Sequence, residues 1–187
     1  KTEIYKGMKL IDEELGGTTP LNVIIKFPKA NDEDELDDDW GEEDEDNSKY
    51  WFTRDKIDKI TLVHDYLDNI NSVGKVISFA SIVRVAEDLT GNKKLDGLEM
   101  GVLYTKIPKS IKKEIIDPYI SIKNNEARIG LRVLDSKEDL RRNELIKKIN
   151  YDLENKLGLN RDEFKLAGVL ILFNNLLQSL FKSQILT

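Results

Sequence analysis

The sequence of 187 residues predicts one α+β domain in which two strand–helix–strand units are separated by a stretch of helices. Three observations lead to this prediction. Apolar residues alternate with polar ones over 21–27 and over 127–133, which is the period of a half-buried strand. Other segments repeat apolar residues every three or four positions, which indicates amphipathic helices. The length fits one domain with a single core, because domains commonly have about 100 to 200 residues.

The first unit is expected to follow a short helix at the start of the chain. That helix has apolar residues at Ile4, Met8, Ile11 and Leu15, and Gly16-Gly17 supplies a left-handed stop after it. The strand over 21–27 comes next.

A second helix is expected to begin at Thr53, whose side chain can cap it. Its apolar face consists of Ile57, Ile60, Val63 or His64, Leu67 and Ile70. The segment 73–79 then reads as the strand that completes the first unit.

The middle of the chain, 81–117, is expected to be a helical insertion that ends at Pro118. The strand over 127–133 opens the second unit, and its polar face is cationic because it carries Arg128 and Arg132. Ser136–Asp139 resembles a capping box, which predicts a long helix directly after it.

That long helix has Leu145, Ile149 and Leu153 on one side and stops at Leu157-Gly158. A short fourth strand is expected over 164–167. The order of elements therefore matches the split βαβ or ferredoxin-like arrangement, a four-stranded antiparallel sheet with two helices on one face. Many unrelated functions use this arrangement, so it identifies none of them.

The negative charge of the chain is concentrated in one segment. Twelve residues between Asp32 and Asp46 are Asp or Glu, which leaves 35 − 12 = 23 acids against 29 Lys and Arg elsewhere. Such a segment repels itself and cannot bury apolar area, so we expect a solvated loop insertion over 30–50. Two alternatives stay open: a divalent-cation cluster at Asp37, Asp38 and Asp39, or a segment that folds back on the basic body.

The sequence offers no catalytic, cofactor-binding or metal site by pattern. There is no cysteine, so disulfides and thiolate metal sites are excluded. His64 is expected at a helix surface or boundary, with no Ser, Cys or second His placed to act with it. Gly16-Gly17 precedes a strand and not a helix, which argues against nucleotide binding. The strands offer aliphatic side chains, with Phe27 as the available aromatic residue, which argues against nucleic-acid binding.

Four segments together resemble the large extracytoplasmic loop of a resistance-nodulation-division (RND) superfamily exporter. They are Ile11-Asp-Glu-Glu-Leu-Gly-Gly-Thr-Thr-Pro-Leu-Asn-Val-Ile-Ile25, Ser72-Val-Gly-Lys-Val-Ile-Ser78, Glu126-Ala-Arg-Ile-Gly-Leu-Arg-Val133, and Ala167-Gly168 at the start of an apolar helix. The resemblance covers most of the chain apart from the acidic segment. It is strongest to the lipid and hydrophobe transporters of the Patched and mycobacterial large membrane protein branches.

The resemblance implies a periplasmic porter domain of a proton-driven exporter in the inner membrane. Transmembrane helices would precede residue 1 and follow 169–187, and the proton-coupling carboxylates would lie in those helices. The implied partners are the rest of the transporter, including its other periplasmic loop, a hydrophobic or lipid-like cargo and possible further copies. No enzymatic activity and no cofactor are implied. The alternative is a stand-alone ferredoxin-like module that is regulatory or binds divalent cations.

The C-terminal helix has apolar residues over more than one narrow stripe, which calls for partners on two sides or proximity to lipid. These residues are Leu170, Phe173, Leu176, Leu177, Leu180, Phe181 and Ile185. We expect Leu176 and Leu180 to pack under the sheet, with Phe173 and Phe181 partly exposed. Gly168 is expected to permit a tight bend between strand and helix.

Deleting residues 32–46 should leave the fold intact, because the acidic segment cannot contribute apolar burial. Thermal unfolding followed by circular dichroism should therefore remain cooperative in the deletion variant. A loss of cooperative unfolding would contradict this expectation.

Overall fold

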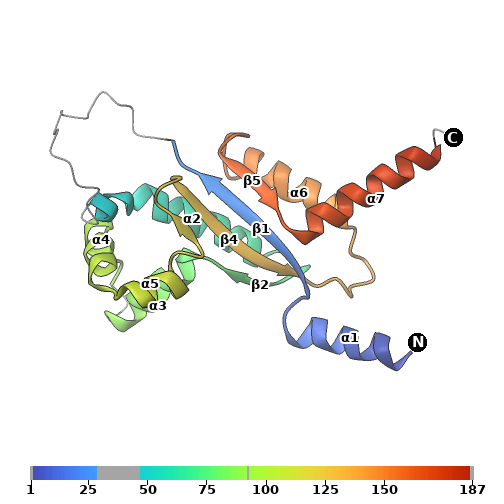
Figure 1. Ribbon diagram of the computed structural model, residues 1–187, viewed down its shortest axis with the longest axis horizontal. Helices are drawn as coiled ribbons and strands as arrows, with labels where there is room; N and C mark the ends of the chain where they lie inside the picture. The colour runs from blue at the N-terminus through green and yellow to red at the C-terminus, as the bar shows by residue number, and fades with distance from the viewer. Residues whose placement is uncertain (1, 29–46, 92, 186–187) are drawn as a thin grey trace.

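The computed structural model describes residues 2–28, 47–91 and 93–185, apart from the side chains of residues 47, 48 and 185. These residues form a five-stranded antiparallel sheet and seven α-helices (Figure 1), so the α+β class is confirmed. The elements are α1 (Glu3–Glu14), β1 (Thr19–Lys26), the 3₁₀ helix η2 (Asn47–Trp51), α2 (Arg54–Asp68), β2 (Val73–Ile77), α3 (Phe79–Leu89), α4 (Gly97–Lys106), α5 (Lys109–Ile115), β3 (Ile120–Ser121), β4 (Glu126–Val133), α6 (Arg142–Asn155), β5 (Phe164–Ala167) and α7 (Val169–Ile185).

The four longer strands lie in the order β2-β4-β1-β5, and each is antiparallel to its neighbours. In the register of β1 and β4, Leu21 lies opposite Leu131 and Val23 opposite Ile129. Since side chains of a strand alternate between faces, these pairs all point to one side of the sheet. All four are buried, so one face of the sheet forms the core and the other does not.

Helices α2 and α6 cover the core face (Figure 1). Thr53 caps α2 as predicted, because its hydroxyl accepts a hydrogen bond from the backbone N–H of Lys56. The predicted apolar faces of both helices are confirmed as buried. The phenol of Tyr66 on α2 also donates to the buried carboxylate of Asp152 on α6, at 2.8 Å, which ties the two helices together.

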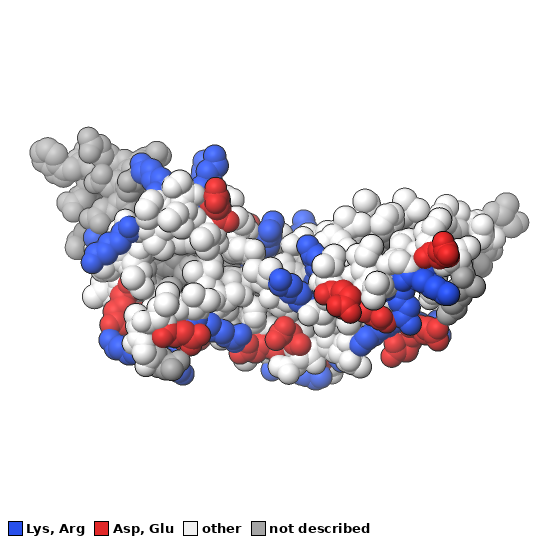
Figure 2. All heavy atoms as spheres, turned by 90° about the horizontal axis from the view of Figure 1, so that it is seen from below, with Lys and Arg blue, Asp and Glu red and all other residues white. Residues whose placement is uncertain are grey.

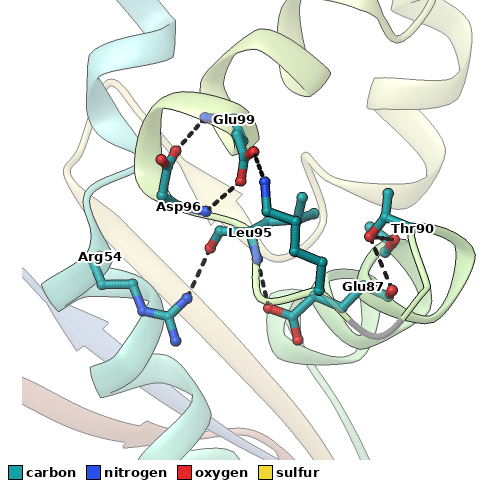
Figure 3. Close-up of polar contacts among 8 residues, drawn as sticks. Arg54, Glu87, Thr90, Leu95, Asp96 and Glu99 are labelled. Carbon is teal, nitrogen blue, oxygen red and sulfur yellow. Dashed lines mark hydrogen bonds and ion pairs between the residues drawn. The ribbon is translucent and has the colours of Figure 1, made fainter.

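Helices α3, α4 and α5 form one end of the molecule (Figure 1), and hydrogen bonds join α2 to α3 and to the connection between α3 and α4. Figure 3 shows that Arg54 of α2 donates to the carbonyl of Leu95 at 2.8 Å, while the Leu95 N–H donates to Glu87 of α3. Asp96 and Glu99 close a capping box at the start of α4. The connection between α3 and α4 is thereby held at its last two residues before α4.

One residue of the β3–β4 turn holds together the described residues that come before and after the acidic segment. Asn125 donates from its side-chain amide to the carbonyls of Phe27 and Pro28, which precede the segment. Its amide oxygen accepts from Trp51 Nε1 and Lys56 Nζ, each at 2.9 Å, which follow the segment. Asp37, Asp38 and Asp39 lie outside the described residues.

The predicted loop over 30–50 extends too far, because η2 forms over residues 47–51. The reason lies in packing: Trp51 and Phe52 are buried, and their rings meet Phe27 and Phe79 edge-on or tilted at centroid distances of 5.3 to 5.7 Å. Such aromatic pairs add to the area they bury. The short strand β3 was not predicted either, since two residues carry no periodic signal.

Two further predictions are wrong. The capping box at Ser136–Asp139 does not form, and α6 begins only at Arg142, because the Ser136 N–H donates to Asp12 instead. His64 is not at a surface or boundary: it is 4 % exposed, and its Nδ1 lies 2.9 Å from the hydroxyl of Ser78. Its position on α2 faces the strands, where β2 ends and α3 begins.

Replacing Asn125 with Ala should destabilise the fold by about 2 to 3 kcal/mol. The backbone of Asn125 is left-handed, with φ of 53°, a conformation that alanine adopts less readily than asparagine. Alanine also cannot form the four side-chain hydrogen bonds of Asn125. Chemical denaturation measures the change. Asn124→Ala, at the exposed neighbouring position, is the matched control and should change stability by less than about 0.5 kcal/mol; equal effects at both positions would contradict the assignment.

Candidate functional site

Helices α1 and α7 leave the sheet at the same end. α1 leads into the start of β1, and α7 follows the end of β5, where Ala167 pairs with Asn22 near that same start. Figure 1 shows both helices extending beyond this end of the sheet, with both termini on that side. Any force applied through either terminus would therefore reach β1, the strand that pairs with both β4 and β5.

The joint between α1 and β1 is packed backbone against backbone. Gly16 and Gly17 have φ of 66° and 100°, as the predicted left-handed stop requires. A Cβ on Gly17 would lie 2.8 Å from the carbonyl of Val133, and one on Gly74 would lie 2.2 Å from the oxygen of Gly16. Both distances are shorter than real contacts allow, so the turn fits against β4 and β2 only because these positions lack side chains.

A buried carboxylate locks the same joint. Asp12 of α1 is 2 % exposed, and its two oxygens accept hydrogen bonds from the Thr18 hydroxyl at 2.6 Å and the Ser136 N–H at 2.9 Å. Burial by itself would raise the pKa of Asp12, but these hydrogen bonds outweigh it and hold the pKa below its usual value of 3.8. The ionised side chain thus connects α1, the start of β1 and the loop after β4.

The joint between β5 and α7 turns at Gly168, and the predicted tight bend is confirmed. Its φ is 122°, and a Cβ there would lie 3.1 Å from the carbonyl of Pro20 on β1. Leu170, two residues later, is fully buried. Asn174, at the next turn of the helix, is buried as well, so the first turns of α7 are seated on the core.

Beyond these joints both helices expose apolar side chains. On α1 they include Ile4, Met8, Leu10 and Ile11, with Leu15 directly after the helix, and on α7 they include Leu172, Phe173, Leu176, Leu177, Leu180 and Phe181. The prediction that Leu176 and Leu180 pack under the sheet is wrong, because α7 runs past the sheet edge and both are about half exposed. In the part of the chain that the structure describes, none of the helices combines the length and the hydropathy that a membrane span requires.

The face of the sheet opposite the core carries a groove with a volume of about 530 Å³. Strands β1, β2 and β4, the last residues of α1 and Tyr119 line it. Its positive side chains are Lys75, Arg128 and Arg132, with Glu14 at the rim. Figure 2 shows a shallow hollow between the two ends of the molecule, with Lys and Arg side chains along it.

Among the described residues, the lone histidine does not form an open reaction centre. The pair of His64 and Ser78 corrects the expectation that no Ser accompanies this histidine, but Ser78 is 0 % exposed and its hydroxyl also caps α3. Burial, followed by the charge of Arg84, lowers the pKa of His64, so it is neutral at pH 7. Across the described ranges, no cluster of three or more His, Cys, Asp or Glu could hold a metal ion.

The cationic face of β4 was visible in the sequence, because Arg128 and Arg132 alternate with buried residues. The sequence did not show that Lys75 lines the groove or that Asp12 is buried at the joint between α1 and β1. Lys75 follows a register shift in β2, so strict alternation from Val73 misplaces it. Asp12 stands among the charged residues of α1, and nothing local distinguishes it from Glu13.

Asp12→Asn should lower the free energy of unfolding by about 1 to 2 kcal/mol, since the amide replaces one charged hydrogen-bond acceptor by a donor. Because the folded-state pKa of Asp12 lies below the unfolded value of 3.8, the ionised group stabilises the fold fully above about pH 4 and less as the pH falls through the folded-state pKa. The stability difference between wild type and variant should therefore be full at pH 7 and shrink in stronger acid. Denaturation at several pH values measures it.

Glu13→Gln is the control for this experiment, because Glu13 is exposed and forms an ion pair with Lys9 across one helical turn at 3.6 Å. Such surface pairs contribute little, so its effect should stay within about 0.5 kcal/mol. A stability difference for Asp12→Asn that is the same at pH 7 and in strong acid would contradict the role of the ionised carboxylate.

Comparison of the chain with protein-family models, with curated proteins and with solved structures found no match. Three features of the described chain bear on its function. These are the two helices that leave one end of the sheet, the tight joints that connect them to β1, and the cationic groove on the open face.

Proposed function

We propose that this chain is the extracytoplasmic porter domain of a proton-driven RND-type exporter, and that it forms part of a passage for hydrophobic or lipid-like cargo. In this proposal α1 and α7 connect the domain to membrane-spanning helices. The domain itself carries out no chemistry. It contributes the shape of the passage and the movement that opens and closes it.

The observation that carries the proposal is the placement of the two terminal helices. Both join the sheet at one end, and both present exposed apolar residues beyond it. A helix that exposes leucine and phenylalanine over a wide arc needs apolar neighbours, and membrane-spanning segments with their lipid would supply them. Two attachments at one end suit a domain that stands on a membrane by that end.

The sheet supports the same proposal. The strand order β2-β4-β1-β5 with every neighbour antiparallel is the order that a ferredoxin-like split βαβ fold requires, with β2 as its second strand, β4 as its third and β5 as its fourth. We propose that topology for the four longer strands, with α2 and α6 as its two crossover helices and α3, α4 and α5 as an insertion between its halves.

The joints suggest how movement would pass through the domain. At α1, the contacts of Gly16, Gly17 and Asp12 pack the end of the helix closely against the ends of β1, β2 and β4. A tilt of α1 would therefore carry the sheet with it as one body, which is how rigid-body motions of domains arise. The alternative, a module that binds divalent cations, is favoured by no cluster in the described part of the chain.

The proposal predicts that the domain is labelled from outside the cytoplasm in the intact native protein. The chain contains no cysteine, so a single Cys can be introduced at Lys113, which is exposed on α5. In cells with a permeabilised outer membrane, a membrane-impermeant maleimide should label Lys113→Cys without lysis. The reading frame should also continue on both sides into apolar segments of about 20 residues, the length that spans a bilayer.

Two controls make the result decisive. The full-length protein without the introduced Cys measures labelling at other positions. Val23→Cys, at a position with 0 % exposure, should be labelled only after denaturation. Labelling of Lys113→Cys that requires lysis, or a reading frame without flanking apolar segments, would show that the exporter proposal is wrong.

A further inference from the structure

The groove on the open face of the sheet has the size and composition of a small-molecule site. Its volume of about 530 Å³ lies within the range of about 300 to 1,000 Å³ that such sites occupy. Its lining combines positive side chains with apolar ones, among them Leu15, Pro20 and Ile77.

Two of the positive charges face each other without compensation. In the register of β2 and β4, Lys75 lies directly opposite Arg132, and both side chains are exposed. Like charges at opposite positions of neighbouring strands are destabilising. Neither side chain forms an ion pair within the described ranges, whereas Arg54 and Arg142 each pair with an aspartate. An anion between Lys75 and Arg132 would replace this repulsion by two attractive contacts.

The floor of the groove is open along β4. Arg128 lies on the same face as Arg132, four residues away, which is roughly 13 Å along a strand. Its guanidinium sits over the ring of Tyr119 at 5.7 Å, which holds it at the far end of the groove. Gly130 stands between the two arginines, and a Cβ there would meet only Asn22 Oδ1 at 3.6 Å and the Ile77 carbonyl at 3.8 Å. The space above Gly130 is therefore free for a ligand.

The apolar lining excludes a purely polar ligand. Leu15 at the end of α1 is 54 % exposed and Ile77 is 36 % exposed, and both border the groove together with Tyr119. A free inorganic anion would leave this apolar surface in water, and a neutral hydrocarbon would leave Lys75 and Arg132 uncompensated. A ligand that has both a charged and an apolar part satisfies both requirements.

We propose that this groove binds an anionic amphiphile with a single alkyl chain and a phosphate head group. Lys75 and Arg132 hold the phosphate, and the alkyl chain lies over Gly130 toward Tyr119, in contact with Ile77. As a statement about cargo, the inference rests on the proposed function, because it names the class of molecule that the exporter would carry. The binding itself is a property of the isolated 187-residue chain.

The test is a titration of the chain with dodecyl phosphate below its critical micelle concentration, followed by calorimetry and by NMR amide shifts. Binding should saturate at one molecule per chain. Arg132→Gln should weaken it about tenfold or more, because one charged contact to the phosphate is lost. Gly130→Val should weaken the binding of dodecyl phosphate as much as Arg132→Gln does, because the valine side chain fills the floor of the groove without a change in charge. A valine at this strand position fits the backbone, so the variant should remain folded.

The matched control is Arg141→Gln, which removes an exposed arginine outside the groove and should leave the affinity unchanged. Dodecyl maltoside, inorganic phosphate and a single-stranded oligonucleotide should each bind at least about tenfold more weakly than dodecyl phosphate. Equal or tighter binding of any of these three, or wild-type affinity in both Arg132→Gln and Gly130→Val, would overturn the proposal.

The two proposals fail in different ways. If dodecyl phosphate does not bind, the groove is not an amphiphile site, and the maleimide labelling still decides on the exporter. If Lys113→Cys is labelled only after lysis, the exporter proposal is wrong, and a measured affinity for dodecyl phosphate would still define a ligand site on this sheet.

Discussion

The pairing of β1 with β4 is the constraint on which the rest of the structure depends. Its register sets Leu21, Val23 and Ile25 opposite Leu131, Ile129 and Ala127, and all six are at most 3 % exposed. Because a shift of one strand by one residue would turn its three apolar side chains to the other face, the burial of this set fixes the register. The register in turn decides which side of the sheet α2 and α6 cover and which side carries the groove.

The same alternation that builds the core places charge on the opposite face. Arg128 and Arg132 are directed outward because Ile129, Leu131 and Val133 are directed inward. No helix of the described residues covers that face, so the arginines keep their charge in water at little cost. A face of this kind is available to a ligand without any rearrangement of the core, which is why the groove and the stability of the domain can be altered separately.

Both terminal helices are packed tightly onto the sheet where they join it, but through different contacts. At α1, three glycines and a buried carboxylate bring backbones into contact; at α7, Gly168 turns the chain over β1, and Leu170 anchors the helix in the core. Each joint is tightly packed, while the helix beyond it is only partly covered. A tightly packed attachment with an uncovered apolar extension suits an element that transmits movement from a neighbouring structure to the sheet.

The sequence by itself determined the elements whose signals are local. The alternation of β1 and β4, the Thr53 cap, the apolar faces of α2 and α6, the glycine stops at 16–17 and 158, and the glycine bend at 168 follow from spacing and backbone preference. Only the tertiary structure decided the burial of His64, the late start of α6 at Arg142, the exposure of Leu176 and the placement of Lys75 opposite Arg132. Three of these depend on a partner distant in sequence, namely Ser78, Asp12 or β4, and the exposure of Leu176 depends on where the sheet ends beside α7. No local pattern records such relations.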